Sequence, residues 1–221
     1  MSFKAAIFDL DGTILNTISD LAAAMNKMLR EQGLPETSLE HNINSVGSGI
    51  KNYVQNCMPQ DKREDAELVK KCEAAMRKNY TEAWNVHTKP YDGIIPLMEY
   101  LTEQGIILNV LSNKVDEATK TMVRYWFGGF KFSCVYGERD GKPRKPDPTV
   151  ALEIAGEIGV SPSEILFIGD SRFDMLTATA AGMYPMAALW GYQSEETLKQ
   201  HGAAHLAADP YEIIDFIKDN S

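Results

Sequence analysis

Short apolar runs that alternate with helical patterns are the strongest constraint on how this chain of 221 residues can fold. Each run is rich in apolar or β-branched residues and is bounded by Asp, Gly, Ser or Asn, which is typical of strands buried in a parallel sheet. Strands that alternate with helices favour a doubly wound α/β fold. The predicted strands cover residues 5–8, 106–111, 132–136, 165–168 and 186–189.

The alternation is interrupted once, early in the chain. Between residues 16 and 88 only helical patterns occur, and they end at the turn-rich segment 89–93. We therefore predict an α/β core domain formed by residues 1–15 and 89–221, with a small all-helical domain inserted at 16–88. The highly charged stretch 60–78 has no pattern from which a role can be assigned.

Composition and charge narrow the class of protein and of partner. A net charge of −9 would repel nucleic acid, so we expect no nucleic-acid partner and a small anionic substrate held by local positive charge. No apolar stretch approaches the roughly 18 residues that a spanning helix needs, so we expect no membrane partner and a cytoplasmic location. Cys57, Cys72 and Cys134 are widely spaced, which argues against a disulfide framework and a zinc site.

Two carboxylates follow the first predicted strand, in Asp9-Leu10-Asp11-Gly12-Thr13. Ligands of α/β sheets collect beyond the carboxyl ends of the strands. Carboxylates at this spacing can point the same way and hold a divalent cation, while one attacks phosphorus and the other moves a proton. Gly12 would let the backbone approach a phosphate. Taken alone, the motif also fits an acidic turn at the end of a strand.

Three further polar motifs follow other predicted strands or border the same crevice. Ser112 and Asn113 end the second strand, where they would bind phosphate oxygens or simply cap a helix. Lys145 lies in a proline-stiffened loop that could equally be a solvated basic turn. Asp170 and Asp174 stand four residues apart at the start of a helix and can share one face. The four motifs together are a stronger signal than any one of them.

In this order the motifs resemble those of the haloacid dehalogenase-like superfamily, in its phosphatase branch, over essentially the whole chain. The resemblance implies a magnesium-dependent phosphohydrolase with a Rossmann-like core, the helical insert being the family's small cap domain. It implies that Asp9 is the nucleophile and a ligand of magnesium (Mg2+). Asp11 would be the general acid and base and would offer its backbone carbonyl to the metal. Ser112 and Lys145 would hold the phosphoryl oxygens.

The same resemblance completes the expected site. Asp170 and Asp174 would join Asp9 and Asp11 around Mg2+, and hard oxygen ligands of this kind suit that ion. Three carboxylates packed together without a metal would repel one another. Further phosphate contacts are expected from residues beside the catalytic ones, namely Gly12, Thr13 and Asn113.

Segments outside the catalytic motifs resemble phosphoglycolate phosphatases, which implies hydrolysis of 2-phosphoglycolate to glycolate and phosphate. These segments are residues 90–93, 111–114, 145–148, 181–183 and 189–192. Gly47, Ser48 and Gly49 form a similar glycine-rich loop, which would present backbone donors to a small carboxylate or would be a plain turn between helices. One departure is Asn16-Thr17, where the family usually has Asp-Ser. Candidate cations of the insert are Lys51, Arg63 and Arg77, although a charged helix is more often a solvated face.

Other functions remain open at this point. A β-phosphoglucomutase-like enzyme would return the phosphoryl group to a sugar, and another small phosphate ester, a nucleotide or pyrophosphate could be the substrate. A catalytically inactive binding or regulatory protein would keep the fold alone. The presence of every expected catalytic residue favours an enzyme acting on a small phosphorylated metabolite, as a monomer or a homodimer.

Overall fold

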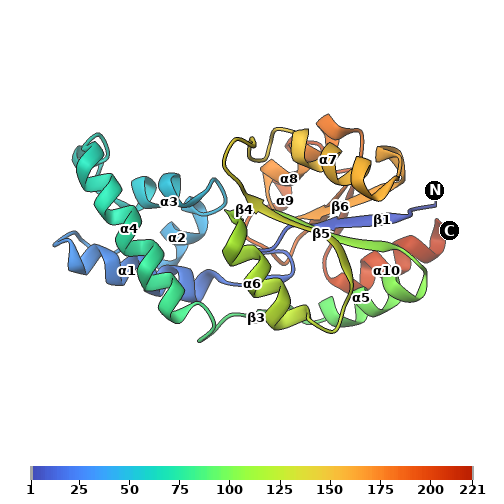
Figure 1. Ribbon diagram of the computed structural model, residues 1–221, viewed down its shortest axis with the longest axis horizontal. Coiled ribbons are helices and arrows are strands. Elements are labelled where there is room, and N and C mark those ends of the chain that lie inside the picture. The colour runs from blue at the N-terminus through green and yellow to red at the C-terminus, as the bar shows by residue number, and fades with distance from the viewer. Residues whose placement is uncertain (1, 221) are drawn as a thin grey trace. The chain divides into compact units, whose positions relative to one another are not determined.

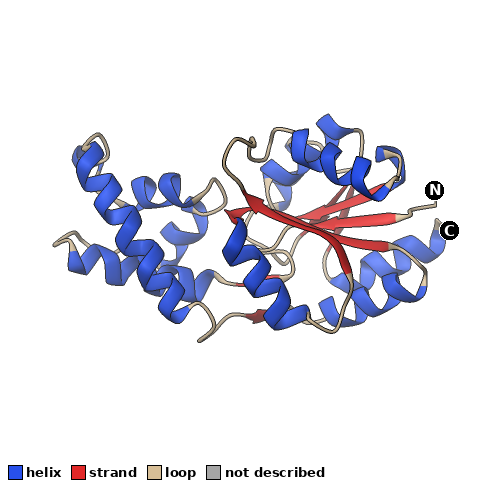
Figure 2. Cartoon of the chain, in the orientation of Figure 1, coloured by secondary structure: helices blue, strands red, loops and turns tan. Residues whose placement is uncertain are grey.

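The computed structural model describes residues 2–220, which divide into two compact units. The first, called here the core unit, comprises residues 2–15 and 90–220. The second, called the helical unit, comprises residues 16–89. Figure 1 labels the elements of each unit, and Figure 2 shows that strands belong almost entirely to the core unit.

A six-stranded parallel sheet forms the centre of the core unit, with the strand order β5-β4-β1-β6-β7-β8. Strand β1 lies between β4 and β6, so the first strand of the chain is central and buried on both faces. This arrangement confirms the predicted doubly wound α/β class. The strands are β1 (Ala5–Phe8), β4 (Ile107–Val115), β5 (Phe132–Glu138), β6 (Ile165–Gly169), β7 (Tyr184–Ala188) and β8 (His205–Ala207).

Helices cover both faces of this sheet (Figure 1). One face is covered by α7 (Thr149–Ile158) and α8 (Arg172–Ala181), and the other by α5 (Ile94–Glu103) and α10 (Pro210–Asp219). Helix α6 (Asp116–Phe127) packs against β4 and β5, and α9 (Glu195–Gln200) packs against α8. A short 3-10 turn, η2 (Pro162–Glu164), precedes β6.

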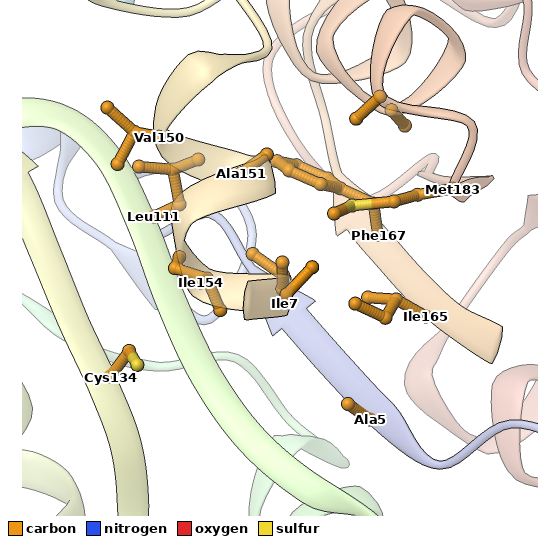
Figure 3. Close-up of a cluster of buried hydrophobic side chains, with 13 residues drawn as sticks. Ala5, Ile7, Leu111, Cys134, Val150, Ala151, Ile154, Ile165, Phe167 and Met183 are labelled. Atoms are coloured by element: carbon orange, nitrogen blue, oxygen red, sulfur yellow. The ribbon is translucent and has the colours of Figure 1, made fainter. Parts of the chain in front are cut away.

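A hydrophobic cluster between the sheet and α7 and α8 sets the direction of the first strand's side chains. Ile7 of β1 and Phe167 of β6 are fully buried there, against Ala151 and Ile154 of α7 (Figure 3). Side chains alternate along a strand. Asp9, two residues beyond Ile7, therefore follows on the face that α7 and α8 cover.

The helical unit contains four helices and a short 3-10 turn within residues 16–89. Part of the charged stretch 60–78 belongs to α4, whose Val69, Cys72, Met76 and Tyr80 are buried in the unit's hydrophobic cluster. No helix among residues 2–220 combines the length and the apolar character that a membrane crossing needs. The elements are α1 (Ile18–Glu31), α2 (Leu39–Ser45), α3 (Ile50–Cys57), η1 (Gln60–Lys62) and α4 (Ala66–Ala83), and the strands β2 (Leu15–Asn16) and β3 (Lys89–Pro90) pair with each other.

A buried carboxylate ties the start of α1 to the last residues of the helical unit. Asp20 is only 2% exposed, and its two oxygens accept hydrogen bonds from the backbone N–H of His87, at 3.0 Å each. Oδ2 of Asp20 also accepts from the backbone N–H and the hydroxyl of Thr88, both at 2.8 Å. Every one of these donors compensates the loss of water around the charge.

The three cysteines are buried free thiols. Burial raises the pKa of Cys57 to about 11. Burial, together with the nearby Glu157 carboxylate, raises the pKa of Cys134 to about 11 as well. Thiols in such surroundings are packing groups and poor nucleophiles near neutral pH.

Candidate active site

Three buried carboxylates and one ammonium meet at the carboxyl edge of the sheet. Ligand oxygens of Asp9, Asp170 and Asp174 all lie within 4.8 Å of one another. The Nζ atom of Lys145 lies 2.9 Å from Oδ1 of Asp9 and 2.6 Å from Oδ1 of Asp174. Asp9 follows β1, Lys145 precedes α7, Asp170 follows β6 and Asp174 lies in the first turn of α8. The fold therefore brings three of the four sequence motifs together in one cluster.

The cluster carries more negative charge than Lys145 neutralises. Burial raises the pKa of Asp9 to about 6, although Lys145 acts in the opposite direction. Burial first, and then the charges of Asp9 and Asp174, raise the pKa of Asp170 well above its usual range. The pKa of Lys145 is also raised, because its two carboxylate partners outweigh the effect of burial. The raised pKa values of Asp9 and Asp170 show that their negative charges are unfavourable in this buried cluster, and a bound cation would stabilise them.

One oxygen of Asp9 is left without a hydrogen-bond donor. Its Oδ1 atom is buried and accepts no hydrogen bond from residues 2–220, because the contact with Lys145 has the distance of an ion pair but not the geometry of a hydrogen bond. Buried carboxylate oxygens without a donor are costly unless a ligand completes them. Hard oxygen ligands of this kind fit a divalent metal such as Mg2+.

The loop after β1 is folded tightly under this cluster. The carbonyl oxygen of Leu10 accepts hydrogen bonds from the backbone N–H groups of Ile14 and Leu15, at 3.1 and 3.0 Å. Gly12 has a φ of +85°, and a Cβ atom at this position would overlap the carboxylate of Asp170. A glycine is therefore required where the loop passes the second carboxylate.

Asp170 is held by two segments that sequence analysis did not assign to it. Its Oδ1 accepts a hydrogen bond from the hydroxyl of Thr13 at 2.9 Å, and its Oδ2 accepts from the backbone N–H of Tyr192 at 2.8 Å. The indole N–H of Trp190 donates to the carbonyl of Thr13 at 2.9 Å, and Gly191 leaves no room for a Cβ beside Asp170. The segment 190–192 thus fixes both Asp170 and the loop after β1.

Both carboxylate oxygens of Asp174 accept hydrogen bonds. Its Oδ1 accepts the hydrogen bond from Lys145, and its Oδ2 accepts from the backbone N–H and the hydroxyl of Ser171, at 3.0 and 2.6 Å. The hydrogen bond from the backbone N–H of Ser171 is one half of the capping box of α8, and the Ser171 side chain accepts from the backbone N–H of Asp174 in the other half. Asp174 thus holds Lys145 in place and also belongs to the acidic cluster, and its binding of a metal stays a prediction.

Asn113 and Ser112 lie at the end of β4, next to Lys145. The side-chain oxygen of Asn113 accepts from the backbone N–H of Lys145 at 2.9 Å, and its amide donates to the Lys145 carbonyl at 3.1 Å. Ser112 is 4% exposed, and its hydroxyl accepts from the backbone N–H of Lys114 at 3.3 Å. Asn113 therefore positions Lys145, while phosphate binding by either residue stays a prediction.

Asp11 stands apart from the three clustered carboxylates. Both of its carboxylate oxygens lie 3.1 Å from Nζ of Lys114, and the two side chains are 16% and 8% exposed. Lys114 lies in the segment 111–114, and the sequence alone predicts no role for it. The pair joins positions 103 residues apart, and no local pattern in the sequence indicates it.

The predicted residues of the insert lie in the helical unit. Gly47 and Gly49 have φ values of 106° and 89°, and Gly49 precedes the first residue of α3. The carbonyl of Ser48 accepts a hydrogen bond from the Asn52 side chain at 3.0 Å. The loop thus depends on glycine for its conformation.

The three candidate cations of the insert differ in their contacts. Arg63 donates to the carbonyls of Met58 and Asn56, at 2.9 and 2.8 Å, so it closes the segment after α3. Arg77 pairs with Glu73 one turn away on α4, and Lys51 is exposed. Arg63 and Arg77 therefore have structural partners.

Comparison with known proteins settles the family. Residues 6–188 match the haloacid dehalogenase-like hydrolases. This chain belongs to that family. A phosphoglycolate phosphatase of Thiobacillus denitrificans is 33% identical over 195 residues, which cover 87% of this chain and 86% of the relative. A phosphoglycolate phosphatase of Aquifex aeolicus is 32% identical, with 86% of each chain covered.

A solved structure agrees with these relatives. The crystal structure of a predicted phosphoglycolate phosphatase from Haemophilus somnus superposes with a TM-score of 0.91 at 26% identity, covering 98% of each chain. The family match and the curated relatives confirm the expected resemblance and the expected phosphatase class of enzyme. Phosphatases of this family generally use a divalent metal, and the acidic cluster offers ligands for one.

Proposed function

We propose that this chain is a Mg2+-dependent phosphatase that hydrolyses 2-phosphoglycolate to glycolate and phosphate through a phosphorylated Asp9. The observation that carries the proposal is the buried Asp9 carboxylate, one oxygen of which has no hydrogen-bond donor, beside Lys145 and two further carboxylates. The names of the two curated relatives support the substrate, because both are phosphoglycolate phosphatases.

The residues that would hold Mg2+ are those of the acidic cluster. Asp9 and Asp170 would be direct ligands, the backbone carbonyl of Asp11 a third, and Asp174 would contribute directly or through water. When bound, the ion would neutralise charge on the phosphoryl oxygens and on the crowded carboxylates. Thr13 and Tyr192 already hold Asp170 at the site.

In the first step a carboxylate oxygen of Asp9 attacks phosphorus. A bond forms between Asp9 and phosphorus, and the bond from phosphorus to the ester oxygen breaks. Asp11 gives its proton to the departing oxygen, so glycolate leaves as the alcohol. The ammonium of Lys145 and the hydroxyl of Ser112 stabilise the negative charge on the phosphoryl oxygens.

In the second step a water molecule attacks the phosphorus of phosphorylated Asp9. Asp11, now a carboxylate, takes a proton from that water. The bond between phosphorus and the Asp9 oxygen breaks, inorganic phosphate leaves, and both carboxyl groups return to their starting states. One pair of carboxyl groups therefore serves both halves of the reaction.

The helical unit takes the part of a cap in this proposal. Gly47, Ser48 and Gly49 would offer backbone N–H groups to the carboxylate of the substrate, and the positive φ values of the two glycines support a loop of that kind. Substrate choice would then depend on the helical unit, and the chemistry on the core unit.

A substrate panel tests the proposal. Phosphate release is measured from 2-phosphoglycolate, sugar phosphates, nucleotides and pyrophosphate, each with Mg2+ and with a chelator. We expect the highest kcat/KM for 2-phosphoglycolate and loss of activity in chelator. Preference for another ester would overturn the substrate and keep the chemistry. Phosphoryl transfer to a sugar would indicate a mutase, and the absence of any release would contradict the proposal.

A further inference from the structure

The core unit holds a second lysine that contacts a carboxylate of the proposed mechanism. Nζ of Lys114 lies 3.1 Å from each oxygen of Asp11, and the Lys114 side chain is only 8% exposed. A cation that contacts both oxygens restricts the rotation of a carboxylate. Loss of one partner of such a shielded pair leaves the other charge uncompensated.

The backbone that presents Lys114 is firmly held. Its N–H donates to the Ser112 hydroxyl at 3.3 Å, and its carbonyl accepts from the Thr119 hydroxyl at 3.3 Å. Gly137 packs directly on this backbone, because a Cβ atom at residue 137 would overlap the Lys114 carbonyl. The backbone N–H of Gly137 donates to Oδ1 of Asp116 at 2.9 Å. The lysine is therefore presented from a fixed point at the end of β4.

Asp11 also belongs to a fixed backbone. It forms an isolated β-bridge with Leu15, and the N–H of Gly12 donates to the Leu15 carbonyl at 2.9 Å. With both backbones held, the contact with Lys114 limits the freedom of the carboxylate itself. Lys145 is engaged with Asp9 and Asp174, so the two lysines serve different carboxylates.

We propose that Lys114 is a positioning residue that holds the Asp11 carboxyl group where it reaches the oxygen of the leaving group. This inference rests on the proposed function, because it assigns Asp11 the proton transfer described there. A misplaced acid transfers its proton poorly, and misplacement by about 1 Å can cost on the order of 100-fold in rate. The effect should therefore depend on how much the leaving group needs a proton.

Two substrates separate positioning from a general structural role. The alcohol of 2-phosphoglycolate is a poor leaving group that needs protonation, whereas p-nitrophenolate leaves without it. For Lys114→Met we expect kcat/KM with 2-phosphoglycolate to fall by about 10- to 100-fold. With p-nitrophenyl phosphate, kcat/KM reports formation of the covalent enzyme and should change by less than about threefold. An equal fall on both substrates would overturn the proposal, and so would no fall on either.

Additional variants sharpen the test. Lys114→Arg keeps the charge and should recover at least part of the activity on 2-phosphoglycolate. Adding Lys114→Met to Asp11→Asn should cause little further loss, because the group to be positioned is already gone. Lys199→Met, which breaks an exposed ion pair on α9, is the matched control and should leave kcat/KM unchanged. A full additional loss in the double variant would contradict the inference.

Failure of the inference can be told from failure of the proposed function. If the wild-type protein with Mg2+ hydrolyses neither substrate, the proposed function itself fails. If the wild type is active and Lys114→Met keeps its discrimination between the two esters, only the role of Lys114 fails. Lys114→Gln repeats the measurement if the methionine variant does not fold.

Discussion

Each of the two units buries an aspartate close to a strand or helix end, and the two carboxylates differ in the hydrogen-bond donors that surround them. Asp20 of the helical unit accepts hydrogen bonds from His87 and from Thr88 through both of its oxygens. Asp9 of the core unit has an oxygen without a hydrogen-bond donor and lies among other carboxylates. A buried charge with all its donors stabilises a fold, whereas one left incomplete and crowded is ready for a ligand.

The largest effect is expected when the charge of Asp9 is removed. Asp9→Asn should lower kcat by about 10⁴-fold or more, because an amide cannot serve as the nucleophile. Its thermal unfolding temperature in chelator should be no lower than that of the wild type, because one of the crowded charges is gone. Phosphate release and thermal unfolding provide the two readings. Substantial residual turnover would remove Asp9 from the mechanism.

Loss of Asp20, the buried aspartate of the helical unit, should lower the stability of the fold and leave turnover nearly unchanged. Asp20→Ala should lower the free energy of unfolding by about 3 kcal/mol, because buried donors of His87 and Thr88 lose their acceptor. At temperatures where the variant is folded, kcat should stay within about threefold of the wild type. Denaturant unfolding measures the loss, with Asp20→Asn as a milder variant. A change below about 1 kcal/mol would mean that these bonds contribute little to the fold.

Metal binding should distinguish a carboxylate of the acidic cluster, Asp170, from Asp20 of the helical unit. At a Mg2+ concentration of about 100 times Kd, binding contributes about 2.7 kcal/mol, which should raise Tm by about 5–10 °C for a chain of this size. Asp170→Asn should remove most of this rise, while Asp20→Ala should keep it. Thermal unfolding with Mg2+ and with chelator gives the comparison. An equal rise in wild type and Asp170→Asn would place the metal elsewhere.

The smallest expected effect is a pH dependence in the metal-free protein. Burial raises the pKa of Asp9 to about 6, so the folded state holds this proton more tightly than the unfolded chain does. The resulting stabilisation is present at low pH and is lost as the pH rises through about 6. In chelator, the fall in Tm between pH 5 and pH 7.5 should be larger for the wild type than for Asp9→Asn. Identical pH profiles would argue against the raised pKa.

The α/β architecture was readable from the sequence because its strands are short, apolar and sharply bounded. The five predicted runs correspond to β1, β4, β5, β6 and β7, with ends that differ by up to four residues. Strand β8 was missed because its three residues, His205–Ala207, have no distinctive pattern. Helix α4 could have been found from the spacing of Val69, Cys72, Met76 and Tyr80, which the surrounding charges conceal.

Part of the site could be predicted from the sequence, because its motifs follow recognisable strands. Carboxyl ends of parallel strands meet at one edge, so motifs following β1 and β6 could be expected to converge, and Asp9 and Asp170 do lie together. Contacts between side chains of residues far apart in the sequence could not be predicted. The pair of Lys114 with Asp11 and the hydrogen bond from Trp190 to Thr13 join residues 103 and 177 positions apart. Side-chain contacts of this kind come from the tertiary structure.

The most direct test of the central claim is to trap the covalent enzyme. Wild-type protein is mixed with 2-phosphoglycolate and Mg2+, and Asp11→Asn with p-nitrophenyl phosphate and Mg2+, because p-nitrophenolate leaves without a proton from Asp11. Both samples are quenched in acid, digested and analysed by mass spectrometry. We expect a phosphoryl group on Asp9, absent from Asp9→Asn and from samples in chelator. Active turnover with Asp9 unmodified, or with the phosphoryl group on another residue, would contradict the account.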